Sequence, residues 1–241
     1  MGVFELSILL VFVISFLLGS IPWGLIISKL FYKKDLRKHG SGNIGTTNAL
    51  RTLGKVGGGI VFLLDFGKGV LAGAIALFIY SKLIAVVPLN LGIFDFKGLQ
   101  YEWMDYSKVT NITKYTQILL ATAACGCIVG HVFSPWLKFK GGKGVAVAVG
   151  CLFVSLGWYP AVAELALFAW LVYVSRYVSV GSITAATVLP FVALWVYGDN
   201  GYAVLMLTIA AVVVIWAHRG NIKRLRQGTE LRIGAKKGDD T

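Results

Sequence analysis

Apolar residues form long runs along this chain, and glycine, asparagine and basic residues collect in the stretches between them. Seven apolar segments are apparent, covering residues 6–31, 58–88, 115–134, 143–157, 160–175, 182–197 and 201–217. The alternation typical of barrel strands is absent, and helices satisfy their own backbone in lipid, so the pattern predicts about seven transmembrane helices. The fourth and fifth segments are about 15 residues each, short for a full span, and could be tilted, lengthened by loop residues or partly re-entrant.

Composition supports the same class. Of the 241 residues, 57% are apolar and only 14% are charged, and the mean hydropathy is +0.76. A soluble domain is nearer half apolar and a quarter charged, so water-soluble domains are excluded. We therefore expect an all-α integral membrane protein in which residues 1–241 form a single polytopic domain.

The first apolar segment does not resemble a cleaved signal peptide. It is preceded by Glu5 and by no basic residue, and its basic group, Lys33 to Lys38, comes afterwards. A signal peptide has a basic start and a shorter apolar stretch. The order predicts a retained first helix whose N-terminus lies outside.

The distribution of charge agrees with this orientation. The chain carries 23 Lys and Arg against 11 Asp and Glu, a formal charge of +12. Seven crossings place residues 32–57, 135–142, 176–181 and 218–241 on the inner side. All but four of the basic residues then belong to that side or its adjoining helix ends, which predicts a cytoplasmic C-terminus.

Two regions are expected to lie outside the bundle. Residues 89–114 are mixed, aromatic and turn-rich, which predicts an extended outer loop on the membrane surface. Residues 231–241 are predicted to be a flexible tail. The three cysteines lie inside apolar runs without CxxC spacing, and the inner face has no carboxylate cluster, so neither a metal nor another cofactor is expected.

The first inner loop contains the string GSGNIGTTNALR, from Gly40 to Arg51. Its glycines suit a backbone that turns and offers N–H groups to an anion, and its hydroxyls and amides add donors. Arg51 supplies a planar fork suited to phosphate. The alternative is a flexible linker, although a linker rarely combines so many donors with an Arg.

The second inner loop contains FKGGKGVAVAVG, from Phe139 to Gly150, and opens a helix. Glycines before a helix start make an anion site from free N–H groups and the helix dipole, and Lys140 and Lys143 add charge. The string is not a Walker A loop, because Gly144 replaces the Ser or Thr. A basic turn that only sets orientation is the alternative.

The last inner segment reads HRGNIKRLRQGTE, from His218 to Glu230. His218, Asn221 and Leu225 recur at helical spacing, so one face points a His and an Asn inward while basic residues on the other meet anionic lipid. A basic stop-transfer helix is the alternative, and it leaves His218 and Asn221 unexplained.

Three further polar residues have open roles. Ser182, in the fourth inner piece, is either a site hydroxyl or a helix cap. Asp65 and Lys68 in the second apolar segment are three residues apart and can pair across one turn. Intramembrane ions mark either function or structural pairing, and the sequence does not separate the two.

Together the inner segments predict a phosphate-bearing ligand at the cytoplasmic membrane surface. The sequence lacks a basic stripe interleaved with aromatics, which would indicate nucleic-acid binding. It implies no protein partner. A transporter for an organic phosphate or anion is the rival class, although its polar sites are expected near the midplane and often in two similar halves. A membrane scaffold leaves the polar strings unexplained.

The strings GSGNIGTTNALR, KGGKGVA and HRGNIKRLRQG, in this order and separated by apolar helices, resemble the acyl-phosphate-dependent membrane glycerol-3-phosphate acyltransferases (the PlsY family). The resemblance implies transfer of a fatty acyl group from acyl-phosphate to the 1-hydroxyl of sn-glycerol 3-phosphate. The products are 1-acyl-sn-glycerol 3-phosphate (lysophosphatidate) and phosphate, in bacterial phospholipid biosynthesis. It also implies a multi-pass protein of the bacterial cytoplasmic (inner) membrane, in contact with membrane lipids and with its active site on the cytoplasmic side.

The resemblance also assigns residues. Those expected to hold glycerol 3-phosphate are Arg51, Lys143, Ser182, His218 and Asn221. Those expected to cradle acyl-phosphate are Ser41, Gly42, Asn43, Gly45, Thr47, Asn48, Gly141 and Gly142. Three of these, His218, Asn221 and Ser41, are expected to take part in catalysis. The sequence departs from the usual family pattern at Thr46, at Val147 and in its longer outer loop.

Acyl-phosphate is already an activated mixed anhydride, so no acyl-enzyme is needed. None of the three histidines is followed by Asp five residues later, so the HxxxxD signature of thioester-dependent acyltransferases is missing. We expect direct attack of the glycerol hydroxyl on the acyl carbon, with catalysis by positioning and charge stabilisation. The proton goes either to His218 or to the donor's own phosphate, and the sequence leaves both possibilities open.

Overall fold

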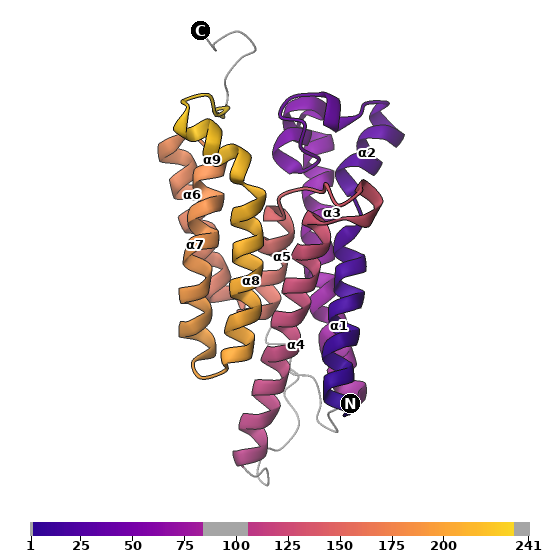
Figure 1. Cartoon of the computed structure of the whole chain (residues 1–241), viewed down its shortest axis with the longest axis vertical. Helices are drawn as coiled ribbons and strands as arrows, with labels where there is room; N and C mark the ends of the chain where they lie inside the picture. The colour runs from indigo at the N-terminus through magenta and orange to yellow at the C-terminus, as the bar shows by residue number, and fades with distance from the viewer. Residues whose placement is uncertain (1, 84–105, 234–241) are drawn as a thin grey trace.

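The computed structural model describes residues 2–83 and 106–233, and within them every regular element is a helix (Figure 1). The α-helices are α1 (Val3–Ser20), α2 (Trp23–Tyr32), α3 (Thr46–Leu83), α4 (Tyr106–Val132), α5 (Val145–Ser155), α6 (Trp158–Ser175), α7 (Val178–Tyr197), α8 (Gly201–Ala217) and α9 (Arg219–Arg226). Two short 3-10 turns, η1 (Leu36–Lys38) and η2 (Pro135–Leu137), lie in the loops. The predicted all-helical membrane architecture is confirmed.

A break at Pro22 divides the first apolar segment into α1 and α2. Pro22 has no N–H to continue the helix, and the residue before a proline is pushed towards extended backbone, as Ile21 is (φ −61°, ψ 117°). The break leaves the carbonyl of Gly19 without its helical partner, while Ile21 O accepts from Trp23 N–H at 3.1 Å.

A second break lies inside α3. Gly54 has φ 80° and ψ −174°, a conformation essentially restricted to glycine, and it separates a short helix after Thr46 from the long helix that follows. The short piece carries the end of the first polar loop, and the long piece enters the bundle.

Glycines let the helices approach closely. A side chain at Gly19 of α1 would collide with the backbone of Cys127 in α4, and one at Gly150 of α5 would collide with the backbone of Phe66 in α3. Small residues at helix crossings are the usual device for tight packing in membranes, where association depends on close contact.

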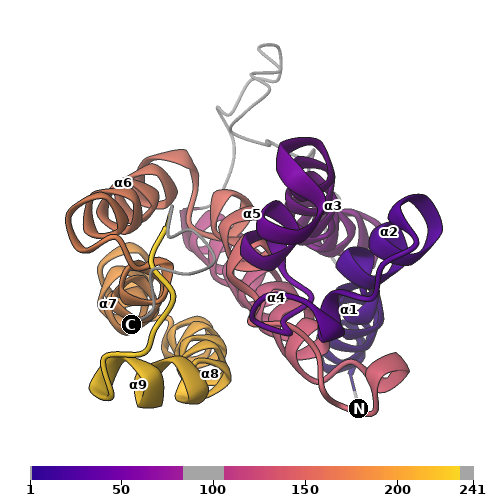
Figure 2. The same ribbon diagram turned by 90° about the horizontal axis from the view of Figure 1, so that it is seen from above.

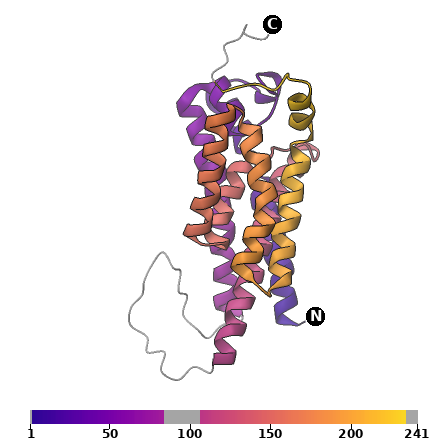
Figure 3. The ribbon, with the colours of Figure 1, turned by 90° about the vertical axis from the view of Figure 1, so that its left-hand side faces the viewer.

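The helices form two groups around a central gap in the ribbon. Viewed from above, α1 to α5 lie on one side, and α6, α7, α8 and α9 lie on the other (Figure 2). The N-terminus lies at the end of the bundle opposite the C-terminal segment (Figures 1 and 3). The described parts of all four predicted inner segments lie at the same end of the bundle.

Five helical stretches of the described chain are long and apolar enough to cross a membrane, and α8 with α9, bent by 50°, makes a sixth candidate. The remaining apolar segment is α5, with only 11 residues. At about 1.5 Å per residue it covers roughly half of the ~30 Å hydrocarbon layer. The seven segments are therefore all present as helices, while seven full crossings and the orientation of the termini stay predictions.

Two boundaries differ from the sequence-based expectation. The predicted outer loop 89–114 falls mostly outside the described residues, but α4 already begins at Tyr106, so the end of that range is helix. The predicted flexible tail begins too early. Ile233 N–H donates to Arg176 O at 2.9 Å, and Arg232 Nε donates to the Tyr177 hydroxyl at 3.0 Å, so Leu231 to Ile233 are held over the bundle.

Candidate active site

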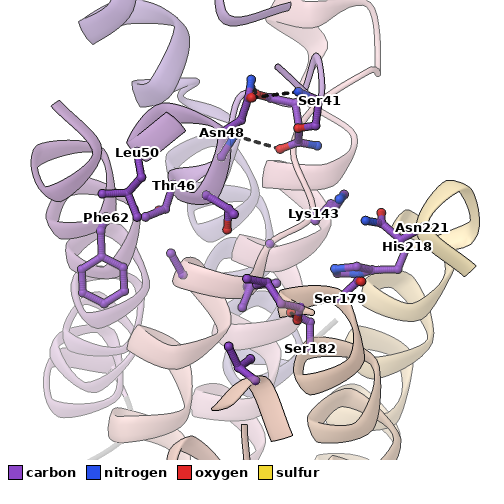
Figure 4. Close-up of a pocket in the computed structure, with 18 of the residues that line it drawn as sticks. Ser41, Thr46, Asn48, Leu50, Phe62, Lys143, Ser179, Ser182, His218 and Asn221 are labelled. Atoms are coloured by element: carbon purple, nitrogen blue, oxygen red, sulfur yellow. Dashed lines mark hydrogen bonds between the residues drawn. The ribbon is translucent and has the colours of Figure 1, made fainter. Parts of the chain in front are cut away.

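A cavity of about 450 Å³ opens between the two helix groups at the end that carries the polar loops (Figure 4). It brings together most of the residues singled out in the sequence. Those that line it are Ser41, Asn43, Gly45, Thr47, Asn48, Arg51, Lys143, Ser182, His218 and Asn221. In the close-up, Lys143 lies between the first loop, with Ser41 and Thr46, and the side of α8 and α9 that carries His218 and Asn221.

Three of the predicted glycines do not line this cavity. The N–H of Gly141 donates to Val132 O at 3.0 Å, and that of Gly142 donates to His131 O at 3.1 Å, so both N–H groups close the loop onto the end of α4. The N–H of Gly42 closes a turn inside the first loop. These three N–H groups are already engaged, and in the second loop the cavity lining begins at Lys143.

The first loop is shaped by Asn48. Its Oδ1 accepts from Ser41 N–H at 2.9 Å, and its Nδ2 lies within 3.1 Å of three backbone carbonyls of the same loop. The residue is 1% exposed. Asn48 therefore lines the wall, but its amide holds the loop in place. The loop's other uncharged polar side chains beside the cavity are those of Ser41, Asn43, Thr46 and Thr47.

Three helices point their N-terminal ends at the cavity. The lining includes Thr46 and Thr47 from the start of α3, Val145 and Ala146 from the start of α5, and Ser179 from the start of α7. The first-turn N–H groups of a helix are free of intrahelical partners and carry partial positive charge. No side chain caps α5 or α7. The arrangement favours a ligand with concentrated negative charge.

Lys143 adds a cation whose pKa lies close to neutral pH. Burial lowers the pKa of the Lys143 ammonium to about 8; the carboxylate of Glu230 opposes this shift, and the guanidinium groups of Arg224 and Arg51 add to it. An anion placed beside Lys143 replaces the lost hydration and favours the charged form.

The C-terminal segment closes one side of the site through Glu230. Its carboxylate accepts from Asn221 Nδ2 at 2.5 Å and from Arg224 Nε at 2.7 Å. Burial raises the pKa of Glu230, but these hydrogen bonds more than offset burial and hold it below its usual value. Next to it, Arg51 Nη2 donates to Leu231 O at 3.4 Å. Glu230 thus fixes the positions of Asn221 and Arg224.

His218 is held in one tautomer. Its Nδ1 lies 2.8 Å from Val214 O, and a carbonyl can only accept, so Nδ1 carries the proton and Nε2 keeps its lone pair. Burial lowers the pKa of His218 to about 4, the bond to Val214 opposes the shift in part, and Lys143 adds to it. His218 is therefore a neutral acceptor near pH 7.

An apolar pocket continues from the cavity into the bundle between α5, α6, α7 and α8. The two share Val145, Val149, Leu165, Phe168 and Ser182. Below these residues the walls are lined by small or apolar side chains and by one carboxyl, and they include Ala161, Glu164, Ala185, Ala186, Leu189 and Ala211. A polar site and an apolar channel are therefore continuous at Ser182, whose hydroxyl donates to Val178 O at 2.9 Å.

Several lining residues were not predicted as site residues: Asp65, His131, Ser179, Arg224 and Glu230. Glu230 ends the third polar string, and its only signal in the sequence is a carboxylate close to Asn221 and Arg224 along the chain. His131 gave no local signal, because its neighbours in space come from other helices. Among the described residues, no group of three His, Cys, Asp or Glu side chains could hold a metal ion.

The chain is similar to known proteins over most of its length. A family model described as glycerol-3-phosphate acyltransferase matches residues 9–228. A protein of that name from Synechococcus sp. (strain CC9902) is 37% identical over 231 residues, covering 96% of this chain and 98% of that protein. Another from Rhodopseudomonas palustris (strain BisB5) is 38% identical over 225 residues, covering 93% and 95%.

Two solved structures are also similar. Both are crystal structures of PlsY, an integral membrane glycerol 3-phosphate acyltransferase. The glycerol 3-phosphate form has a TM-score of 0.72 and 32% identity, and the lysophosphatidic acid form has a TM-score of 0.70 and 31% identity. Each comparison covers 95% of this chain and 96% of the other.

Proposed function

This chain belongs to the membrane glycerol-3-phosphate acyltransferase family, and from that membership we propose how its cavity performs the reaction. It is an acyltransferase that esterifies glycerol 3-phosphate, which removes the transporter alternative. For the donor we propose acyl-phosphate, as the resemblance implied. The observation that carries the proposal is the single cavity in which Arg51, Lys143 and three helix N-termini face His218 and Asn221.

Both substrates bring a phosphoryl group, and the cavity offers enough cationic groups for two. The first turns of α3 and α5 lie on one side with Lys143, while Arg51 and Arg224 lie towards the C-terminal segment. We assign the acyl-phosphate to Ser41, Asn43, Thr47 and the α5 N-terminus. Glycerol 3-phosphate is assigned to Arg51, Lys143 and Asn221. Backbone N–H groups fixed in helices stabilise developing charge without reorganisation.

His218 orients the glycerol hydroxyl. Its Nε2 lone pair accepts the hydroxyl hydrogen bond and holds the oxygen for attack on the acyl carbon. A histidine with a pKa of about 4 is a poor final acceptor for this proton. We therefore assign the proton to the departing phosphate. The new ester C–O bond forms, the acyl carbon–phosphate oxygen bond breaks, and the phosphate leaves carrying the hydroxyl proton.

The acyl chain occupies the apolar pocket. The acyl carbon lies one bond from the phosphoryl oxygen, so the chain starts where the phosphate is held. The pocket descends from that point between α5 and α7 and keeps the methylene groups out of water. Ser182 stands at the junction, where the carbonyl of the donor is expected.

We also propose how the protein is oriented in the membrane. The positive-inside distribution of Lys and Arg supports an inner, cytoplasmic position for the loop end of the bundle. Water-soluble glycerol 3-phosphate would then enter from the cytoplasm, while the acyl chain enters between helices from lipid. A bacterial cytoplasmic membrane fits the organisms of the relatives.

The proposed donor is tested with purified protein in detergent or lipid. Acyl-phosphate with glycerol 3-phosphate is expected to give one lysophosphatidate per phosphate released, followed by mass spectrometry and a phosphate assay. Acyl-CoA of the same chain length serves as the competing donor. Transfer from acyl-CoA at an equal or greater rate, with none from acyl-phosphate, would overturn the donor assignment.

A further inference from the structure

A buried polar cluster adjoins the cavity but belongs to none of the three polar strings. Lys68 Nζ lies 2.7 Å from Gly19 O, 3.0 Å from Ile21 O and 2.9 Å from His131 Nδ1. It also lies 3.0 Å from Asp65 Oδ1. Asp65, Lys68 and His131 are each no more than 5% exposed.

The break at Pro22 accounts for the position of Lys68. The carbonyl of Gly19 has no helical donor at the break, while that of Ile21 accepts from Trp23 N–H at 3.1 Å and has a second lone pair available. Lys68 reaches both from α3, and Asp65 balances its charge within one helical turn. Two of the three ammonium protons are therefore donated to these carbonyls.

The third proton determines the state of His131. An ammonium has donors and no acceptor, so His131 Nδ1 must accept from Lys68 with its lone pair. The ring is then neutral, and its single proton lies on Nε2. Asp65 does not compete for this ring, since its Oδ1 is 3.8 Å from Nδ1, beyond hydrogen-bond distance.

The Nε2 edge of the His131 ring faces the second polar loop. An added side chain at Gly142 would collide with His131 Nε2, so the glycine is what admits the ring at this place. Gly142 N–H also donates to His131 O, so the loop is held against His131 at the residue immediately before Lys143. His131 lines the cavity, and within the described chain its Nε2 has no hydrogen-bond partner.

We propose that His131 is a substrate-binding residue whose neutral Nε2–H donates to a phosphoryl oxygen held beside Lys143 and the first turn of α5. Lys68 and Asp65 act through it as positioning residues that fix its tautomer. The inference rests on the proposed function, because it needs a phosphoryl group in this cavity. Glycerol 3-phosphate and the acyl-phosphate donor share that group, and the experiment separates them.

The two amide variants of His131 separate its two nitrogens. His131→Asn keeps an acceptor near the place of Nδ1 and removes the Nε2 donor, whereas His131→Gln can return an N–H near the place of Nε2. We expect His131→Asn to raise the KM for one of the two substrates about tenfold or more, since hydrogen bonds to charged groups are among the stronger ones. His131→Gln should recover to within about threefold of the unaltered enzyme.

The substrate whose KM rises identifies the phosphoryl group. His39, an exposed histidine outside the cavity lining, provides the matched control through His39→Asn and His39→Gln. An equal loss in both His131 variants, or no change in either KM, would overturn the proposal. Lys143→Ala is measured in parallel: if it too leaves both KM values unchanged, the proposed function fails, whereas a change there alone leaves only the His131 inference refuted.

A direct measurement avoids dependence on the folding of these variants. The chain has three histidines, so ¹⁵N-histidine NMR of the unaltered protein resolves few ring signals, assigned with His39→Asn and His218→Asn. We expect His131 to show a protonated Nε2 and an unprotonated Nδ1, and the Nε2 signal to shift on titration with glycerol 3-phosphate or inorganic phosphate. An Nδ1-protonated ring, or no shift at saturation with either, would contradict the inference.

Discussion

At the scale of single residues, Lys143 has a charge that depends on pH within the working range. Its lowered pKa of about 8 means that the ammonium loses its proton, and with it the attraction for phosphate, as pH rises through that value. A phosphate monoester is already dianionic there. We predict that kcat/KM for glycerol 3-phosphate falls towards tenfold per pH unit above about 8.

Lys143→Arg is the matched control for this profile. Arginine stays charged far above pH 8, so the variant should keep a flat alkaline limb even if its overall activity is lower. Initial rates between pH 6 and 10 measure both enzymes. An alkaline fall of the same position and slope in Lys143→Arg would show that another group titrates.

His218 can be assigned as an orienting acceptor or as a base that keeps the proton. His218→Ala removes the acceptor and should lower kcat by about 10² or more, in the range of acid–base and orienting groups. His218→Gln can place an oxygen near Nε2, and we predict that it retains activity within roughly tenfold of the unaltered enzyme. If Gln were as damaging as Ala, the proton would have to pass to the imidazole.

Residue roles could be predicted where the chemistry was local. Lys143 and His218 stood out because a cation or an imidazole followed an apolar run in a polar string. The engaged N–H groups of Gly141 and Gly142 could not be foreseen, since their partners are carbonyls of α4. The tautomer of His131 likewise depends on a lysine 63 positions away.

At the scale of elements, the side chains of α7 that line the apolar pocket should limit the length of acyl chain that the enzyme accepts. Ala186 lines the pocket, whereas the neighbouring Thr187 is exposed on the other face of the helix. Ala186→Phe fills space that the chain needs, and we predict at least a tenfold loss in kcat/KM for long donors with little change for short ones. Thr187→Phe adds the same ring to the lipid face and should leave the chain-length profile unaltered.

Mass spectrometry of products formed from a mixture of donors reads this profile in one reaction. Equal loss across all chain lengths in Ala186→Phe would mean that the pocket supports the fold and does not hold the acyl chain.

Helices were predictable as elements, but their breaks and lengths were less so. All seven apolar segments became helices, because backbone groups in lipid must be satisfied locally. The fourth segment is shortened to the 11 residues of α5 because Gly144 before it, with φ 79°, and Gly157 after it, with φ 83°, are not helical. The break at Gly54 follows from a glycine conformation that the sequence permits but does not require.

At the scale of the whole molecule, the alternation of helices predicts that the polar loops share one side of the membrane. Exposed positions suited to introduced cysteines are Lys38 in the first loop, Arg226 at the end of α9 and Asp199 in the turn between α7 and α8. The three native cysteines are buried. We expect Lys38→Cys and Arg226→Cys to be labelled from the cytoplasmic side only, and Asp199→Cys from the outer side only.

Labelling of Lys38→Cys and Arg226→Cys from opposite sides would separate the loops that form the cavity. That the loops share one end of the bundle was predictable from charge and helix number together. The convergence of the loops on one cavity was not predictable, because it depends on the C-terminal segment folding back so that Leu231 contacts Arg51.

Direct acyl transfer requires both substrates to occupy this one cavity together. The most direct measurement is a crystal structure with glycerol 3-phosphate and a non-reactive acyl-phosphonate bound at once. We predict two phosphorus positions between the starts of α3 and α5 and the segment around Asn221, with the acyl chain in the pocket beside Ala186. If the two ligands exclude each other, or if either phosphorus lies outside the cavity, direct transfer between them is contradicted.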